Sequence, residues 1–190
     1  MKNLVISFRI FLFLTILTGI LYPLLITGTA QTVFPDKASG SIVIKGGKKR
    51  GSLLIGQEFS DSCYFTSRPS HISYNPLPSG GSNYALTNRK LRENVLMRRD
   101  KFIEFNELDS ITPIPSEMLF SSASGLDPHI SPEAALLQVK RIGRCRNFPD
   151  SLQKKIIDLI NFLTEEPQFH MFGQKRINVF LLNLSLDTLK

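Results

Sequence analysis

Asp127 and His129 are the residues of this 190-residue chain whose types and spacing come closest to a chemical site. They flank Pro128 and lie just before Ser131-Pro132, a pair typical of the first turn of a helix. A carboxylate and an imidazole held at a helix entrance would suit a cation, a phosphate or a side chain of a partner. A structural loop, in which Asp127 accepts backbone N–H bonds, is the interpretation we favour over catalysis and, by less, over partner contact.

Motifs of established chemistry are absent from the sequence. Lys48 follows two glycines, but the segment lacks the glycine spacing and the following Ser or Thr of a phosphate-binding loop. No GxGxxG, GxSxG or HExxH occurs, and His71, His129 and His170 lie far apart in the sequence. A pair formed in space by Cys63 and a histidine stays open. We predict no catalytic residue, no metal ligand and no hydrolytic machinery of the chain's own.

The two cysteines, Cys63 and Cys145, leave their redox state open. In an oxidising compartment they could pair and close a long loop. They lack the spacing of a CxxC motif, and isolated thiols often serve as small hydrophobic side chains. We predict the unpaired form.

The N-terminal segment is long and apolar enough to cross a membrane. Leu4 to Ile26 carries one charge, Arg9, and at about 1.5 Å per residue would span roughly 34 Å, against a bilayer core of about 30 Å. Pro23 and Gly28 predict that the helix ends close to Ile26. We therefore predict a membrane anchor over residues 1–30, with the span at about 4–26.

Two other interpretations of this segment compete with the anchor. A buried helix of a soluble protein is the simpler one. A cleaved signal peptide is supported by the basic residues Lys2 and Arg9 and by the small residues that precede Gln31. The apolar run is longer than the usual signal-peptide core of about 7–15 residues, which favours an uncleaved anchor.

The chain is basic, with a formal net charge of +7. Such a charge suits nucleic acid, anionic lipid or an acidic partner and does not choose among them. The basic run from Arg89 to Lys101 has no interleaved aromatic residues, so we interpret it as a solvated helix face and predict no nucleic-acid partner. Basic residues flank the anchor on both sides, and the positive-inside rule gives a weak preference for a cytoplasmic N-terminus. Residues 51–190 would then be extracytoplasmic.

Local patterns predict an α+β (mixed α/β) domain over residues 51–190 behind one transmembrane helix. Residues 31–50 are predicted as a juxtamembrane connector and a basic turn. A hairpin is predicted from Ser41–Ile44 and Ser52–Ile55, and the Pro-, Gly- and Ser-rich residues 68–88 predict a long loop, which in a compact domain is usually functional or disordered. The other predicted elements are a short strand within 57–65, a helix capped by Thr87 and running to about Arg99, a strand over 119–123, helices over 132–146 and from Asp150 to before Pro167, and a strand over 177–186.

Several motifs resemble the C subunit of the Kdp-type, high-affinity potassium-transporting ATPases of bacteria. The most specific is Ser124-Gly-Leu-Asp-Pro-His-Ile-Ser-Pro-Glu-Ala-Ala135, followed by Gln138. The resemblance covers nearly the whole chain and also includes residues 51–57, Arg68-Pro69-Ser70, Tyr74-Asn75-Pro76, Ser79-Gly80-Gly81-Ser82-Asn83, Phe172-Gly173 and 176–179. The chain departs from the family pattern at Arg89, where proline is expected, and at Gly143 and Cys145, where alanine is common.

The resemblance implies an accessory, non-catalytic subunit in the bacterial inner membrane. Its partners would be a channel-like K⁺-conducting subunit, a P-type ATPase subunit and, as a further candidate, a small single-helix subunit, together with membrane lipid. It would stabilise the assembly and raise the ATP affinity of the ATPase subunit, with ATP as a weakly held candidate ligand and no tightly bound cofactor. The candidate partner or nucleotide contacts are Arg68, Ser79, Gly80, Gly81, Ser82, Asn83, Asp127, His129 and Gln138.

Two features of the chain argue against a direct contact with ATP. Ser79-Gly80-Gly81-Ser82 faintly resembles the signature loop of ABC transporters, but four small residues more often form a turn. A domain outside the membrane would also meet little ATP. The alternative function is a stand-alone, membrane-anchored extracytoplasmic binding protein, or a hydrolase that uses Asp127 and His129.

Overall fold

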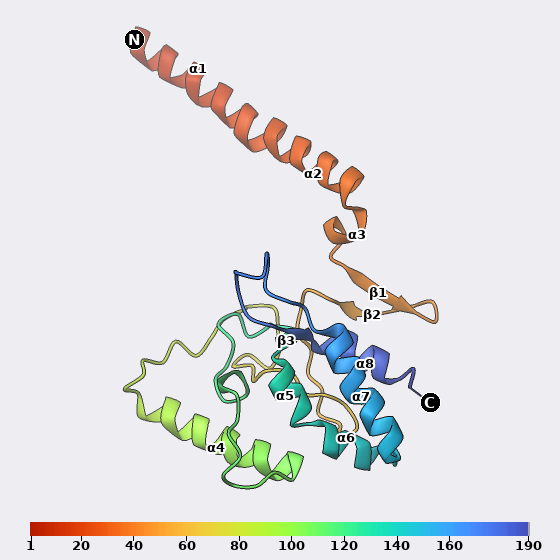
Figure 1. Cartoon of the computed structure of the whole chain (residues 1–190). Coiled ribbons are helices and arrows are strands. Elements are labelled where there is room, and N and C mark those ends of the chain that lie inside the picture. Colours follow the sequence, from red (N-terminus) through yellow and green to blue (C-terminus); the bar gives the residue numbers. More distant parts are fainter. Residues whose placement is uncertain (190) are drawn as a thin grey trace. The chain divides into compact units, whose positions relative to one another are not determined.

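The computed structural model describes residues 1–189 and divides them into two compact units. The first unit comprises Met1–Ser52, and the second begins at Leu53. Figure 1 shows the long N-terminal helix and the hairpin of the first unit, and the helices and loops of the second. The residue ranges predicted for the anchor, the connector and the domain remain predictions, because a compact unit is not itself a membrane boundary.

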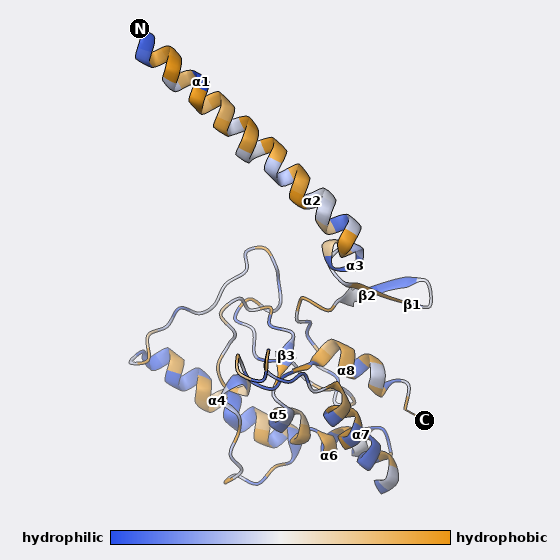
Figure 2. Ribbon diagram, turned by 45° about the horizontal axis from the view of Figure 1, so that its top comes forward, coloured by the Kyte–Doolittle hydropathy of each residue, from blue (hydrophilic) through white to orange (hydrophobic). Residues whose placement is uncertain are grey.

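The N-terminal helix is continuous from Lys2 to Val33 and is long and apolar enough to cross a membrane. It consists of α1 (Lys2–Ile16), a π-helical turn η1 (Leu17–Leu21) and α2 (Tyr22–Val33), and none of their residues is fully buried. Hydrophobic residues predominate along most of its length, as the hydropathy colouring of the ribbon shows (Figure 2). The predicted helix end near Ile26 is wrong. Pro23 lies in the first turn of α2, directly after η1, where the usual hydrogen-bond ladder is already shifted, and one glycine costs a helix only about 1 kcal/mol.

The predicted hairpin is present in the first unit. A short helix α3 (Pro35–Ala38) precedes the antiparallel strands β1 (Ile42–Lys45) and β2 (Lys48–Ser52). Gly46 and Gly47 both have positive φ angles, +62° and +72°, as a tight two-residue hairpin turn requires. This turn places Lys48 directly opposite Lys45, so the second strand begins earlier than the predicted Ser52–Ile55.

The second unit mixes helices with a small sheet, which confirms the α+β prediction. Its elements are α4 (Arg89–Asn106), the 3₁₀ turn η2 (Ser116–Met118), β3 (His129–Ile130), α5 (Pro132–Leu136), α6 (Val139–Cys145), α7 (Asp150–Leu163), β4 (Ile177–Asn178) and α8 (Val179–Leu186). Strands β3 and β4 pair antiparallel, with His129 opposite Asn178 and Ile130 opposite Ile177. The core lies between α5, α6, α7 and α8 and is filled by fully buried side chains such as Ile142, Ile160 and Leu182.

The predicted strand over 177–186 is wrong beyond its first two residues. Asn178 ends β4 and caps α8, because its side chain accepts a hydrogen bond from the N–H of Leu181. A short, continuous apolar run does not distinguish a buried strand from a buried helix. Val179, Leu182 and Leu186 bury one side of α8 in the core.

Three other predicted elements differ from the structure. The stretches 57–65 and 119–123 form no strand, because their backbone bonds go to side chains and loops rather than to a neighbouring strand. The helix predicted over 132–146 is divided into α5 and α6 at Leu137-Gln138. The cap of α4 is Asn88 rather than Thr87, since the Asn88 side chain accepts a bond from the N–H of Lys90. The Ser131 cap and the start of the next helix at Asp150 are confirmed.

The loop from Leu53 to Asn88 contains no helix or strand and is held by side chains of distant elements. Asn183 of α8 accepts from the N–H of Phe65 and donates to its carbonyl, at 2.8 and 2.9 Å. The loop is also joined to α6 by a Cys63–Cys145 disulfide. The prediction of unpaired cysteines is therefore wrong, since the fold brings the end of α6 beside residues 61–65.

Candidate functional site

Arg68, Asp127 and His129 form a compact polar cluster. Arg68 Nη1 donates to Asp127 Oδ2 at 2.6 Å, and His129 Nδ1 lies 3.3 Å from Asp127 Oδ1. The backbone N–H of His129 also donates to Asp127 Oδ1, at 3.0 Å. The sequence motif therefore places the carboxylate and the imidazole together, and the long loop supplies an arginine that local spacing does not reveal.

The charge of Asp127 is fixed by this cluster. Burial opposes its ionisation, but hydrogen bonds from His129 and Arg68 and the charge of Arg68 outweigh it and lower its pKa from 3.8 to about 2. Asp127 is thus an anion at any physiological pH. A general acid or base works best with a pKa near the working pH, so this carboxylate suits a fixed contact better than a proton transfer.

The cluster borders two hollows of the second unit. One has a volume of about 550 Å³ and is lined by Arg68, Asp127 and His129 together with charged residues of the segment between α7 and β4. The other, of about 630 Å³, is lined by Leu54 and Ile55 and by residues 122–124 and 126–128. Arg68 and Asp127 line both hollows, and Nε of Arg68 is buried without a hydrogen-bond partner.

The backbone around Asp127 is tightly packed. Gly56 donates its N–H to the carbonyl of Leu126 at 2.7 Å, and a Cβ at Gly56 would lie 2.7 Å from the Asp127 carbonyl oxygen. The carbonyl of Pro128 accepts from the N–H of Val179 at the start of α8. These contacts hold the carboxylate and the imidazole in position through three separate parts of the chain.

Gln138 lies in the interior rather than on the surface. It is fully buried at the break between α5 and α6, and its Oε1 accepts from the N–H and hydroxyl of Thr66 and from Arg141. Its side-chain amide donates to the carbonyl of Ala134 at 3.2 Å. A role of Gln138 in contacts with a partner or nucleotide, which remains a prediction, would therefore have to act through the position of residues 66–68.

The loop Ser79–Asn83 lies beside the motif that contains Asp127. The N–H of Gly80 donates to the carbonyl of Ser124, and Gly81 packs against the backbone of Ala123. Ser79 and Asn83 are exposed, whereas the residues between them are half-buried. The structure thus brings this loop to the same region as Asp127, but the loop does not open a helix, so it lacks the helix N-terminus that commonly binds phosphate.

Sequence reasoning missed Arg141 of α6, which is 5% exposed and donates four hydrogen bonds. The acceptors are Oδ1 of Asn106, Oε1 of Gln138 and the carbonyls of Ser62 and Tyr64. Burial lowers its pKa to about 10, against the opposing charge of Asp61. Arg141 thus ties the loop to α4 and α6. The residues around Arg141 carry no local signal for this role in a single sequence.

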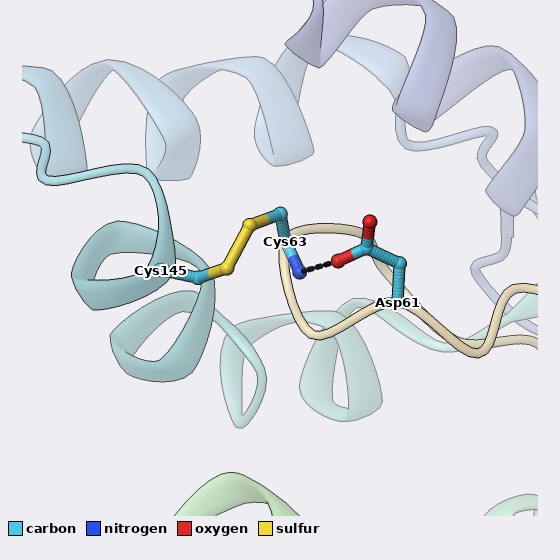
Figure 3. A group of neighbouring side chains, drawn as sticks. All are labelled: Asp61, Cys63 and Cys145. Atoms are coloured by element: carbon cyan, nitrogen blue, oxygen red, sulfur yellow. Dashed lines mark hydrogen bonds between the residues drawn. A yellow bond between two sulfur atoms is a disulfide. The ribbon is translucent and has the colours of Figure 1, made fainter.

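Figure 3 shows the Cys63–Cys145 disulfide with Asp61 beside it. Asp61 turns back on the loop and accepts from the N–H of Cys63 at 2.8 Å. A carboxylate oxygen of Asp61 and the two sulfurs lie within 4.8 Å of one another, as metal ligands do, but the sulfurs are joined and thiolates are the form that ligates metals. The disulfide also removes Cys63 as a nucleophile for any histidine partner.

Comparison with known proteins decides the family. The family model described as "KdpC: K+-transporting ATPase, c chain" matches residues 4–188. The chain belongs to the KdpC family. Its relatives named as the KdpC subunit of the potassium-transporting ATPase include one from Caldanaerobacter subterraneus, 44% identical over 172 residues, which are 90% of this chain and 87% of the relative. The KdpC subunit of Trichlorobacter lovleyi is 44% identical over 193 residues, 100% of this chain and 99% of the relative.

Proposed function

We propose that the chain is the membrane-anchored accessory subunit of an ATP-driven potassium-transporting complex and performs no hydrolysis itself. The observation that carries this proposal is the family match over residues 4–188, which includes the apolar helix Lys2–Val33 as well as the domain behind it. The two relatives, which cover 90% and 100% of the chain, are named as subunits of a potassium-transporting ATPase. A stand-alone binding protein or hydrolase has no comparable support.

The chemistry of the polar cluster agrees with a non-catalytic role. Asp127 is engaged by Arg68 and His129 and has a low pKa, so it presents a permanent negative charge rather than an exchangeable proton. The cluster lines two hollows, and Nε of Arg68 has no partner. We assign it to contact with a partner subunit.

The proposed partners are the K⁺-conducting subunit and the P-type ATPase subunit, with a small single-helix subunit as a further candidate. The anchor offers Thr15, Thr18 and Gly19 for close packing with their transmembrane helices, because small residues let helix backbones approach. No residue of α1, η1 or α2 is fully buried within the chain, so these positions are available to lipid or to other helices.

We further propose that the domain faces the exterior or the periplasm. The Cys63–Cys145 disulfide supports this orientation, because disulfides persist in oxidising compartments and are rare in the cytosol. An effect of this subunit on ATP affinity would then be transmitted through its partners, and a direct contact of Ser79–Asn83 with ATP would require the opposite orientation.

Co-expression with genes for the proposed partner subunits tests the function. The tagged chain should co-purify with a channel-like membrane protein and a P-type ATPase, and Asp127→Ala or His129→Ala should reduce assembly or K⁺ uptake. Asp158→Ala on the exposed face of α7 is the matched control. A purified monomer that turns over a substrate without partners would refute the proposal. Wild-type K⁺ uptake in both site variants would refute the role of this cluster and leave the proposed subunit function intact.

Orientation is tested on intact spheroplasts. A membrane-impermeant reductant followed by an impermeant maleimide should label Cys63 and Cys145 if the domain is outside. Labelling only after the membrane is permeabilised would place the domain in the cytoplasm and reopen a direct role for ATP.

A further inference from the structure

The segment between α7 and β4 forms a hairpin with an exposed apolar tip. Isolated bridges pair Glu165 with Arg176 and Gln168 with Phe172, and the chain reverses at residues 169–171. In Figure 1 this blue segment stands off the body of the second unit. We call residues 169–172, which are three apolar residues and the exposed His170, the apolar tip. Its three apolar side chains, Phe169, Met171 and Phe172, are 84%, 77% and 65% exposed.

Backbone hydrogen bonds within the hairpin preorganise this tip. The N–H groups of His170, Met171 and Phe172 donate to the carbonyls of Pro167 and Gln168, at 2.9 to 3.1 Å. Backbone N–H groups that enter an apolar medium without a partner are costly, so the donors of a lipid-inserting loop should be satisfied internally. Three consecutive residues of the apolar tip meet that condition.

Two ion pairs follow directly behind the apolar tip. Glu165 pairs with Arg176 at 2.9 Å, and Glu166 pairs with Lys175 at 2.8 Å. All four side chains are exposed. The hairpin is therefore apolar at its end and charged, but electrically balanced, at its base. That division matches the two sides of a membrane interface, where apolar side chains enter the acyl region and charged ones stay among the headgroups.

We propose that the apolar tip inserts into the lipid bilayer that holds the anchor. The helix suited to cross the membrane ends at Val33 and the domain begins at Leu53, so the connecting residues, even fully extended, span at most roughly 70 Å. This tether keeps a lipid surface at high effective concentration, whereas contact with a protein depends on assembly. The tip is a projection rather than a groove, which suits insertion. Insertion of the tip requires the anchor but does not require a partner subunit.

The test uses the chain's lack of tryptophan. Full-length protein with Phe169→Trp is reconstituted alone in phospholipid vesicles, with or without lipids brominated on their acyl chains. The matched control is Ile111→Trp, at a loop residue that is 89% exposed. We expect blue-shifted emission from Phe169→Trp and quenching by brominated lipid severalfold stronger than for the control. The quenching measurement does not depend on the orientation of the chain in the vesicle, because the domain meets a bilayer surface on either side.

A second variant separates insertion from non-specific proximity. Adding Met171→Asp to Phe169→Trp should withdraw the tip and abolish the excess quenching, since a carboxylate is costly in the acyl region. Equal quenching of Phe169→Trp and Ile111→Trp overturns the proposal. So does a blue shift that arises only when the other subunits are added, which would make the apolar tip a protein contact. Neither result bears on co-purification or K⁺ uptake, which test the proposed function separately.

Discussion

Replacing Asp127 by asparagine measures how strongly the polar cluster is held in its charged form. The substitution keeps the shape of the side chain and an oxygen that can accept from the His129 N–H, and it removes the charge that faces Arg68. The pKa of Asp127 is lowered from 3.8 to about 2, and each pKa unit corresponds to about 1.4 kcal/mol. Because the side chain is 30% exposed, solvent screening reduces this contribution, and we expect a loss of about 2 kcal/mol in unfolding free energy at pH 7.

The stability contribution of the Asp127 charge depends on pH in a definite direction. The folded-state pKa is depressed, so the stabilisation is fully present above pH 3.8 and is lost as the pH falls toward 2. The difference between wild type and Asp127→Asn should therefore shrink from about 2 kcal/mol at pH 7 to a few tenths of a kcal/mol near pH 2 and vanish below it. Near pH 2 about half of the wild-type carboxyl groups are protonated, and a protonated carboxyl resembles the amide.

Urea denaturation of the full-length chain in mild detergent, followed by far-ultraviolet circular dichroism, measures the difference. The disulfide stays oxidised throughout, and the exposed Asp158→Asn on α7 serves as the matched control. Equal stability of wild type and Asp127→Asn at pH 7 would refute the reasoning. A difference that is as large at pH 2 as at pH 7 would also refute it, because it would then arise from packing rather than from charge.

Three further substitutions test the contacts that hold the site. Arg141→Met should lower the unfolding free energy by about 3 kcal/mol, because it leaves buried acceptors without the guanidinium donor, as measured by urea denaturation. The double variant Cys63→Ser and Cys145→Ser should lose about 3 kcal/mol, since the disulfide closes a loop with a sequence separation of 82, and calorimetry should show a lower melting temperature. Gly56→Ala should cost about 2 kcal/mol in the same denaturation assay, because its Cβ would meet a backbone carbonyl at 2.7 Å.

Each of these substitutions has a matched comparison. Arg141→Lys keeps the charge but lacks the fork of donors, so a lysine variant as stable as wild type would mean that the hydrogen bonds matter little. Reductant should destabilise wild type and leave the double serine variant unchanged, and an effect on both would point elsewhere. Gly80→Ala adds a Cβ with no atom within 4 Å, and a loss equal to that of Gly56→Ala would contradict the steric explanation.

Local signals in the sequence predicted the helix starts better than the strands. Ser131 caps α5 through its own side chain, and Gly46-Gly47 supplies the positive φ angles of the hairpin turn. Such signals belong to one or two residues and act within one turn. The apolar run after Asn178 has no such signal, because a helix and a strand buried on both sides present the same composition. Tertiary contacts in the core decided in favour of α8.

The long loop could not be predicted for a different reason. Residues 53–88 obtain their order from side chains far away in sequence, and single-sequence patterns carry no record of them. Phe65 is bonded by Asn183 at a separation of 118 residues, and Thr66 by Gln138 at 72. The disulfide has the same origin, since Cys63 and Cys145 meet only once α6 lies beside the loop. Of the candidate contacts, the motif around Asp127 was evident locally, and its pairing with Arg68 depended on this loop.

The loop over residues 53–88 connects the polar cluster to the core in one network of hydrogen bonds. Gln138 holds Thr66, and Tyr74 holds the carbonyl of Arg68, so the arginine that faces Asp127 is positioned from both sides. Burial raises the pKa of Tyr74 to about 12, which keeps its hydroxyl a donor at any physiological pH. A substitution at Gln138 would therefore disturb the cluster without touching a partner. Loss of assembly is evidence for direct contact only in a variant that retains its stability. Asp127→Asn, compared with wild type at the same folded fraction, is therefore more informative than any variant of the buried residues.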